Sequence, residues 1–324
     1  MGLLVIDRGA VRRLLPYEAC IPLMRQAMSA LSAGQTQQLL RQIVDLGDGA
    51  AFGVMPGAMA EAFGAKLISV RPAPAGPGAQ SHQGFVALFD PKDGAPIAVL
   101  HAGEITAIRT AAASAAATGA LARPEASRVA ILGTGEQAHA HAVAMTKVRQ
   151  VSRLAVWGRS AARAKALAEA LRGELEVPVD VAASVEAAVA RADIICAVSA
   201  ASEPILLNRL VADGAHINLV GSSRAGPREI DDDLVVRARF IADHREGVLR
   251  QGAEFLHAKA AGLIGDDHIV AEIGEVFLGD RVGRRSPDEV TIYKSLGSIV
   301  QDLAAGWHVY QAARREEAGT SVPF

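Results

Sequence analysis

The most constraining feature of this sequence is the segment at residues 129–145, which reads VAILGTGEQAHAHAVAM. It begins as a short apolar run, passes through Gly133 and Gly135, and continues as an alanine-rich stretch with helical spacing. Ala138 takes the third position of a G-x-G-x-x-G/A pattern, where a small residue lets helix and strand pack closely. An ordinary tight turn is the alternative. A strand before the glycines and a helix after them favour a turn whose backbone binds the pyrophosphate of a dinucleotide.

Strands and helices alternate beyond a long alanine-rich helix that starts at about residue 104, EITAIRTAAASAAATGALA. The predicted strands are RVAIL, RLAVW, VPVDVA, DIICAV, HINLV and ARFIAD, with helical segments such as AARAKALAEALRG between several of them. Such alternation is typical of a parallel sheet. It predicts an α/β protein with a Rossmann-type, doubly wound parallel sheet.

The first third of the chain has a different pattern. Residues 17–34 show helical apolar spacing that stops at a glycine, and short β-rich runs separated by Gly, Pro and Asp turns follow them. DPKDG joins two of these runs and predicts a hairpin, whereas RPAPAGPGAQ, at residues 71–80, predicts a mobile loop. These patterns indicate an α+β domain with an antiparallel sheet.

The end of the chain predicts that the parallel sheet is an insertion. The segment VTIYKSLGSIVQDLAAGWHVYQAARR ends in a helix that no strand is expected to follow, and this helix is expected to return to the first domain. We therefore predict a substrate-binding and dimerisation domain at residues 1–115 plus 296–324, and an NAD(P)-binding domain at residues 116–295.

Composition narrows the functional classes. The chain has 324 residues and a formal net charge of −2, which gives no electrostatic reason to bind nucleic acid or an anionic membrane. Cys20 and Cys196 lie far apart and show no metal-ligand spacing, so we expect neither a disulfide framework nor a metal site. The N-terminus carries charges within its apolar stretch, and no apolar run approaches the length of a membrane span. We expect a cytoplasmic protein.

The residues after the second predicted strand bear on the choice of dinucleotide. An NAD site normally has an acidic residue there to hold the ribose 2′-hydroxyl, and an NADP site offers arginine to a 2′-phosphate. This sequence has no acid at that place and instead has Gly158, Arg159, Ser160 and Arg163. The pattern favours NADPH, with NADH as the alternative. Arg159 could otherwise be a solvated residue at a helix start.

Several segments resemble the ornithine cyclodeaminase/μ-crystallin family, in matching order and over nearly the whole chain: GAKLISV, SHQGFVALFDPKDGAP, EITAIRTAAASAAAT, ILGTGEQA, ADIICAVSA, HINLVGSS, REID and YKSLG. The resemblance implies a dimer, a first domain that binds substrate and forms the subunit interface, and an inserted Rossmann domain. It also implies chemistry at the α-carbon of an amino or imino acid.

By this resemblance, Lys66 and Arg109 match residues that hold the substrate carboxylate, and Arg41 matches a third basic position. Fixed cationic donors suit a small carboxylate, and arginine also fixes its orientation. Arg109 lies in an apolar helix and is difficult to explain as a surface base, whereas the neighbourhood of Arg41 leaves that alternative open.

The same resemblance assigns cofactor contacts to the turns after the predicted strands and to single positions beside them: Thr110, Gly133, Thr134, Gly135, Glu136, Gln137, Ala138, Trp157, Arg159, Ser160, Arg163, Val198, Ser199, Val220, Gly221, Ser222 and Gly297.

One position departs from the cyclodeaminases. In those enzymes the segment after the strand matching HINLV carries an aspartate that acts at the α-amino group, but Ser223 occupies that place here. A neutral hydroxyl is a poor base at physiological pH, so the departure argues against oxidative cyclodeamination. Reduction of a preformed cyclic ketimine requires only hydride at C2 and a proton on nitrogen, which water or Ser223 could relay.

The VGSS, REID and SHQG segments look most like the family members that reduce Δ1-pyrroline-2-carboxylate and its piperideine homologue to L-proline and L-pipecolate. His82, in SHQG, could donate a proton to the imine nitrogen or simply order the loop before a strand. For His139 and His141 a structural or cofactor-edge role is favoured. Other reactions of the family stay open: ornithine cyclodeamination, and alanine- or opine-type dehydrogenation. A catalytically idle protein that binds NADPH and another ligand, as μ-crystallin can, is the alternative of a different class.

Overall fold

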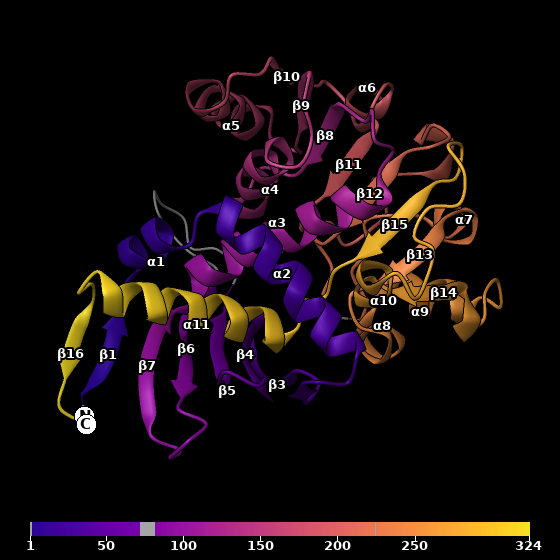
Figure 1. The fold of residues 1–324 in the computed structure, drawn as a ribbon. Coiled ribbons are helices and arrows are strands. Elements are labelled where there is room, and N and C mark those ends of the chain that lie inside the picture. The colour runs from indigo at the N-terminus through magenta and orange to yellow at the C-terminus, as the bar shows by residue number, and fades with distance from the viewer. Residues whose placement is uncertain (1, 72–81, 224) are drawn as a thin grey trace. The chain divides into compact units, whose positions relative to one another are not determined.

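The computed structural model describes residues 2–71, 82–223 and 225–324 (Figure 1). The chain forms two compact units, one of Met1–Arg109 with Ser298–Phe324 and one of Thr110–Gly297. The first unit is α+β and the second has a parallel sheet. The predicted α/β fold class, with a Rossmann-type sheet inserted into an α+β domain, is confirmed. The assignment of substrate to the first unit and cofactor to the second stays a prediction.

The sheet of the first unit has the strand order β16-β1-β7-β6-β5-β4-β2, and β3 also pairs with β4. The bounds are β1 Leu3–Ile6, β2 Gln37–Gln38, β3 Gln42–Gly47, β4 Ala50–Ala58, β5 Phe63–Val70, β6 His82–Phe89, β7 Pro96–His101 and β16 Thr320–Val322. The predicted DPKDG hairpin is confirmed between β6 and β7, where the Gly94 amide donates to the Asp90 carbonyl. The sheet is mixed rather than purely antiparallel, because β1 runs parallel to β7.

Helices α2 (Tyr17–Ser32) and α11 (Ile299–Arg315) pack together, and α11 crosses one face of this sheet (Figure 1). Because side chains alternate between faces along a strand, Met55, Lys66 and Val86, which stand opposite one another on adjacent strands, share the face under α11. A Cβ atom on Gly57 would lie 2.5 Å from Cγ2 of Ile299, so the missing side chain permits this close crossing. The inner face thereby positions Lys66 beneath α11.

The other face of the sheet keeps large apolar side chains exposed. Val44, on β3, is 57% exposed and Phe85, on β6, is 44% exposed. Phe63 and Phe89 stack on adjacent strands with their ring centroids 5.3 Å apart. Large apolar side chains exposed together on one face of a sheet are typical of an interaction surface.

The sheet of the second unit has the order β10-β9-β8-β11-β12-β15-β13-β14, and all its pairings are parallel. The bounds are β8 Arg128–Leu132, β9 Arg153–Trp157, β10 Val179–Val181, β11 Ile194–Ala197, β12 His216–Leu219, β13 Arg239–Ala242, β14 Ile269–Glu272 and β15 Thr291–Lys294. The strand order reverses between β8 and β11, and open α/β sheets bind ligands at the carboxyl ends of the strands beside such a switch.

The remaining helices are α1 Arg8–Leu14, α3 Ala102–Leu121, α4 Glu136–Thr146, α5 Ala161–Glu174, α6 Val185–Val189, α7 Asp232–Arg237, α8 Arg245–Gln251, α9 Ala253–Ala260 and α10 Ile273–Leu278. Short 3₁₀ turns occupy Asn208–Leu210 and Asp266–His268. Side chains of Ser160, Ser184 and Asp231 cap α5, α6 and α7.

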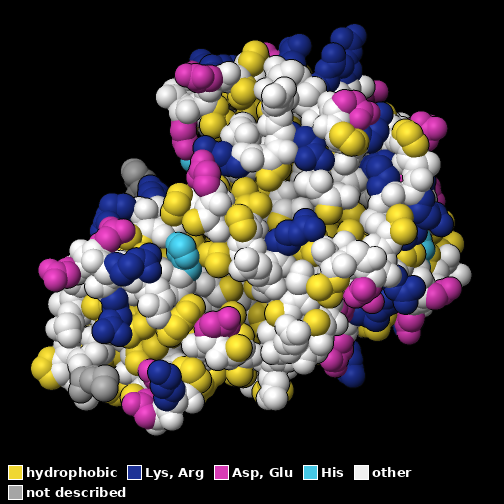
Figure 2. Space-filling model, viewed as in Figure 1, with side chains coloured by type: hydrophobic (Ala, Val, Ile, Leu, Met, Phe, Trp, Pro, Cys, Tyr) yellow, Lys and Arg dark blue, Asp and Glu magenta, His cyan; other side chains and the backbone are white. Residues whose placement is uncertain are grey.

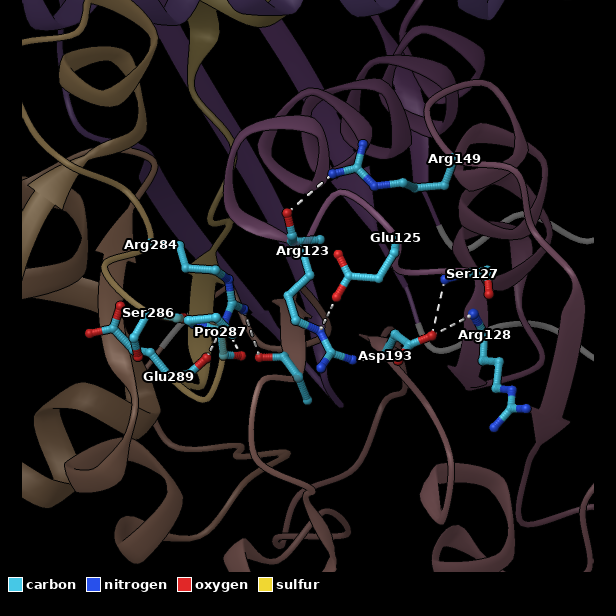
Figure 3. Close-up of polar contacts among 12 residues, drawn as sticks. Arg123, Glu125, Ser127, Arg128, Arg149, Asp193, Arg284, Ser286, Pro287 and Glu289 are labelled. Carbon is cyan, nitrogen blue, oxygen red and sulfur yellow. Dashed lines mark hydrogen bonds and ion pairs between the residues drawn. The ribbon is translucent and has the colours of Figure 1, made fainter.

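Arginines gather around the C-terminal end of α3 (Figure 3). Arg149 donates to the carbonyl oxygens of Thr118 and Ala122, and Arg284 donates to that of Leu121. The Thr118 oxygen also accepts from the Ala122 amide, whereas the oxygens of Leu121 and Ala122 lie at and just after the last residue of the helix, so the guanidinium groups satisfy them. Arg123 pairs with Asp193 at 2.7 Å in the same group.

Several short strands were not expected from the sequence, and β1 is one of them. The prediction that no strand follows the last helix is wrong, because β16 follows α11 and pairs with β1. Strands β14 and β15 were also missed, and β15 lies inside the sheet between β12 and β13. Strands of three or four residues have too few positions to show a periodic pattern. The predicted mobile loop lies outside the described residues except for Arg71.

On the face drawn in Figure 2, basic and acidic side chains are interspersed, in keeping with the net charge of −2. Within the described ranges, no helix is both long enough and apolar enough to cross a membrane.

Candidate active site

A buried charge cluster lies between the sheet and α11 in the first unit. Lys66 comes from β5, Arg109 from α3 and Asp302 from α11. Oδ1 of Asp302 lies 3.2 Å from Lys66 Nζ and 3.1 Å from Arg109 Nε, so one carboxylate oxygen pairs with both cations. The two cations are 3% exposed, and Asp302 is fully buried. The structure therefore brings together two residues that the resemblance assigned to the substrate carboxylate.

Three further polar side chains of this cluster were missed from the sequence: Asp302, Thr106 and Gln301. Lys66 Nζ donates to Thr106 Oγ1 at 2.6 Å, and Arg109 Nη1 donates to Gln301 Oε1 at 2.7 Å. The available signal was the pair Gln301 and Asp302 inside the apolar run SIVQDLAAG, because a buried acid needs a cationic partner.

The cluster changes the acidity of its members. Burial lowers the pKa of Lys66 to about 7, against the raising effect of Asp302 and with the help of the positive charges on Arg109 and Arg41. Burial opposes ionisation of Asp302, but the charges and hydrogen bonds of Arg109 and Lys66 outweigh it and hold the pKa of that carboxyl below its ordinary value. Lys66 can therefore exchange a proton near neutral pH while Asp302 stays ionised.

Arg41 adds a third cation to this group. It is half-buried, directly precedes β3, and lies close enough for its charge to act on Lys66. Arg41 thus brings a third positive charge near that of Lys66. Basic side chains gathered in a largely buried place suit a small anionic group, such as a substrate carboxylate. The assignment of Arg41, Lys66 and Arg109 to that carboxylate stays a prediction.

In the second unit, most of the predicted cofactor contacts follow directly after parallel strands. Gly133 to Ala138 follow β8, Trp157 to Arg163 end and follow β9, Val198 and Ser199 follow β11, and Val220 to Ser222 follow β12. Gly297 comes shortly after β15. Because these strands are parallel neighbours, their carboxyl ends lie along one edge of the sheet. Thr110 is the exception, since it lies within α3.

The glycine turn after β8 suits a pyrophosphate. Gly133 has a φ of +147°, and a Cβ atom there would lie 2.6 Å from the carbonyl oxygen of Val198. Gly135 is different, because a Cβ atom would meet nothing within 4 Å. Packing thus requires glycine at 133, whereas glycine at 135 keeps open space in front of α4. No side chain caps α4, and Ala138 is fully buried in its first turn.

The residues predicted to recognise the 2′-phosphate of NADPH are exposed. Arg159 directly precedes Ser160, whose hydroxyl accepts a hydrogen bond from the Arg163 amide and caps α5. Among the described residues, the side chains of Arg159 and Arg163 have no hydrogen-bond or ion-pair partner. Ser160 thus has a structural role of its own, while both arginines present their charge to solvent. Selection of NADPH by Arg159 stays a prediction.

The other predicted residues are placed as follows. Ser223 is half-buried, two residues after Gly221 in the turn that follows β12. The Gly297 amide donates to Asp243 Oδ2 at 2.7 Å. His82 begins β6, but its side chain lies outside the described part of the structure. The catalytic assignments of Ser223 and His82 stay predictions.

The two histidines of α4 make local contacts. His139 Nε2 lies 2.8 Å from Glu174 Oε2. His141 is fully buried between the Gln137 carbonyl and Ser114 Oγ, and burial lowers the pKa of its ring to about 4, so it is neutral at physiological pH. In residues 2–71, 82–223 and 225–324, no group of three or more His, Cys, Asp or Glu side chains could hold a metal ion.

Comparison with known proteins identifies the family. Residues 4–317 match the ornithine cyclodeaminase/mu-crystallin family. Ketimine reductase mu-crystallin of Mus musculus is 37% identical over 298 residues, which are 90% of this chain and 91% of that protein. The chain therefore belongs to the ornithine cyclodeaminase/mu-crystallin family, and the resemblance noted in the sequence is confirmed.

Solved structures share the whole fold. The structure of Thermococcus litoralis Δ1-pyrroline-2-carboxylate reductase in complex with NADH and L-proline matches with a TM-score of 0.96 at 30% identity, over 99% of this chain and 100% of that one. An archaeal alanine dehydrogenase dimer with bound NAD matches with a TM-score of 0.94 at 26% identity, over 100% of both chains. The likeness thus extends to both units of the chain.

Proposed function

We propose that this protein reduces small cyclic α-imino acids, Δ1-pyrroline-2-carboxylate and Δ1-piperideine-2-carboxylate, to L-proline and L-pipecolate. The observation that carries the proposal is the buried cluster of Lys66, Arg109 and Asp302, which has more positive than negative charge and a lysine that titrates near neutral pH. The relatives of this protein include a ketimine reductase and a Δ1-pyrroline-2-carboxylate reductase, which support the same reaction class.

In the proposed mechanism, Arg109 and Arg41 hold the substrate carboxylate, and Lys66, which the resemblance assigns to the same carboxylate, also donates a proton to the ring nitrogen. Gln301 and Asp302 fix the guanidinium of Arg109 through Nη1 and Nε, which leaves Nη2 for the carboxylate. A nicotinamide cofactor, when bound, supplies the hydride that adds to C2. The C=N double bond thereby becomes a C–N single bond, with a new C–H bond at C2 and a new N–H bond made with the proton from Lys66, which becomes neutral.

The second unit would hold this cofactor along the carboxyl edge of its sheet. The open space at Gly135 and the uncapped N-terminus of α4 suit the pyrophosphate. The exposed Arg159, with no acid beside it, suits a 2′-phosphate and so favours NADPH over NADH. NADH stays the alternative because the Thermococcus litoralis structure contains it.

Ser223 supports the reductive direction. A serine at this position cannot remove a proton from an α-ammonium group as a carboxylate would. Protonation of an imine needs no such base, and Lys66 supplies the proton. We therefore propose that the enzyme reduces ketimines and does not release ammonia from ornithine.

The test is a cofactor-oxidation assay with purified protein. Oxidation of NADPH is expected with Δ1-pyrroline-2-carboxylate and Δ1-piperideine-2-carboxylate, and at a lower kcat/KM with NADH. Pyruvate with ammonia tests for an alanine dehydrogenase, pyruvate with an amino acid for an opine-type enzyme, and L-ornithine with the oxidised cofactor for a cyclodeaminase. Ammonia release from ornithine at a rate comparable to ketimine reduction would refute the interpretation of Ser223. Cofactor binding without turnover of any of these substrates would instead favour a ligand-binding protein.

The protein is further proposed to be a homodimer that associates through the exposed apolar face of the first unit's sheet, around Val44 and Phe85. Light scattering should give about twice the chain mass of 33.7 kDa. Val44→Asp should shift the mass towards that of one chain, because it places a charge in an apolar contact. Val181→Asp is the matched control, at a 39% exposed valine of the second unit. An unchanged mass for Val44→Asp would argue against this interface.

A further inference from the structure

A buried carboxylate joins two turns at the carboxyl edge of the parallel sheet. Glu229, from the REID segment, is fully buried. Its Oε1 accepts from the amide and the hydroxyl of Ser199, each at 2.7 Å, and its Oε2 accepts from the Gly221 amide at 2.7 Å. Ser199 follows β11 and Gly221 follows β12, so one side chain ties together the turns after two adjacent strands.

The close fit around Gly221 shows how tightly these turns are held. A Cβ atom at this position would lie 2.1 Å from the Ser199 carbonyl oxygen and 2.5 Å from Glu229 Oε2. Only glycine leaves room for the carboxylate and the neighbouring turn together. The Gly221 amide also reaches the Ala197 carbonyl at 3.2 Å, but its shorter contact is with Glu229.

A buried ion pair supports the next residue of the same turn. Lys294, at the end of β15, lies with its Nζ 2.7 Å from Glu254 Oε2, and both side chains are fully buried. The same Nζ donates to the Ser222 carbonyl at 2.7 Å. Glu254 Oε1 in turn accepts from the Glu229 amide at 3.3 Å. The three ionisable groups thus form one connected network behind residues 221 and 222.

We propose that Glu229 is a positioning residue of the cofactor site, which sets the Ser199 and Gly221 turns in the geometry that the nicotinamide cofactor requires. Lys294 and Glu254 complete this support by fixing Ser222. The inference rests on the proposed function, because the cofactor role of these turns is itself part of that proposal. Burial of three ionisable groups has a desolvation cost that an apolar trio would avoid. In return, the three buried groups fix backbone atoms at two turns where the predicted cofactor contacts lie.

The first test is Glu229→Gln, with NADH and NADPH binding measured by fluorescence titration. Glutamine can still accept from Ser199, but it turns an NH₂ group towards the Gly221 amide, which then keeps only its longer contact with the Ala197 carbonyl at 3.2 Å. The dissociation constant for cofactor should rise by about 10- to 100-fold, as expected for the loss of a hydrogen bond to a charged acceptor. The KM for the imino acid at saturating cofactor should stay within about twofold of the parent value, because the first unit is unchanged. Glu169→Gln, on the exposed side of α5, is the matched control and should bind cofactor like the parent.

The second test measures cofactor affinity as a function of pH. If Glu229 only stabilised the fold, its ionisation would not change this affinity. Burial raises the pKa of Glu229 to about 7, against the hydrogen bonds from Ser199 and the charge of Lys294, while Glu254 raises it further. The ionised form offers more acceptors to Ser199 and Gly221, so NADH affinity of the parent should fall by up to about 10-fold between about pH 8 and about pH 6. The Glu229→Gln variant should lose this dependence. NADH is the probe because it lacks a 2′-phosphate that titrates in the same range.

A second variant covers the case in which Glu229→Gln does not fold. Lys294→Met combined with Glu254→Leu removes both charges of the buried pair, which typically preserves stability, yet abolishes the support of Ser222. Its cofactor affinity should also fall. If a folded variant of either kind bound cofactor with the affinity and the pH dependence of the parent, the inference about Glu229 would be wrong. The proposed function would not be affected by that result. A parent protein that binds neither NADH nor NADPH would overturn the proposed function itself.

Discussion

Replacing Arg109 with lysine is expected to lower kcat/KM for Δ1-pyrroline-2-carboxylate by about 100-fold. Lysine keeps the charge but cannot donate to Gln301 and Asp302 while also presenting a fork to the substrate carboxylate. The loss of a charge-assisted hydrogen bond in a buried place is worth about 3 kcal/mol, which corresponds to that factor. Steady-state kinetics measures the loss, and cofactor titration should give a dissociation constant close to that of the parent.

Arg13→Lys is the matched control, because Arg13 belongs to the same unit and forms an exposed ion pair with Glu316. Exposed pairs contribute little, so this variant should retain parent kinetics. If Arg109→Lys also retained parent kcat/KM on every imino acid tested, Arg109 would be structural and the proposed carboxylate site would be wrong.

Asp302→Asn is expected to reduce stability and to shift the pH dependence of the reaction. The substitution leaves Lys66 and Arg109 buried without a counter-charge, and breaking a buried pair in this way typically costs about 3–5 kcal/mol. The charge of Asp302 raises the pKa of Lys66, so its removal should lower that pKa further below about 7. Less Lys66 is then protonated at neutral pH. The alkaline limb of the kcat/KM profile should move to lower pH.

Chemical denaturation measures the loss of stability, and a pH–rate profile measures the shift. Asp48→Asn is the matched control, because Asp48 lies in an exposed turn of the same unit at a φ of 51°, a conformation that asparagine also adopts. An alkaline limb that stayed in place in a folded Asp302→Asn protein would show that Lys66 does not supply the proton.

Some strands could be predicted because the pattern that defines them lies within their own residues. RVAIL and RLAVW coincide with β8 and β9, because strands inside a parallel sheet are typically continuous apolar runs. The glycine turn is equally local, since Gly133 needs a positive φ and Gly135 needs an open approach. Lys66 and Arg109 were identified only through the resemblance to a family, not through spacing.

The features that could not be predicted from the sequence depend on contacts with residues far along the chain. TIYK was not recognised as β15 because its end residues are polar, yet both are buried through distant contacts: Thr291 with His216, and Lys294 with Glu254. Asp302 was missed for the same reason. Its acidity and its function are defined by Lys66 and Arg109, and no local pattern on α11 reveals them. Polar residues in an apolar run predict that a partner exists without identifying it.

The discontinuity of the first unit has a consequence for the order in which the chain can fold. Asp302 lies 236 residues after Lys66 and 193 residues after Arg109. During synthesis, the sheet therefore emerges with two cations facing a surface that α11 has not yet covered, whereas all of Thr110–Gly297 is already made. The inserted unit can complete its own core first. The first unit must wait for the last tenth of the chain, so the parallel sheet can form before Asp302 is present to balance the charges of Lys66 and Arg109.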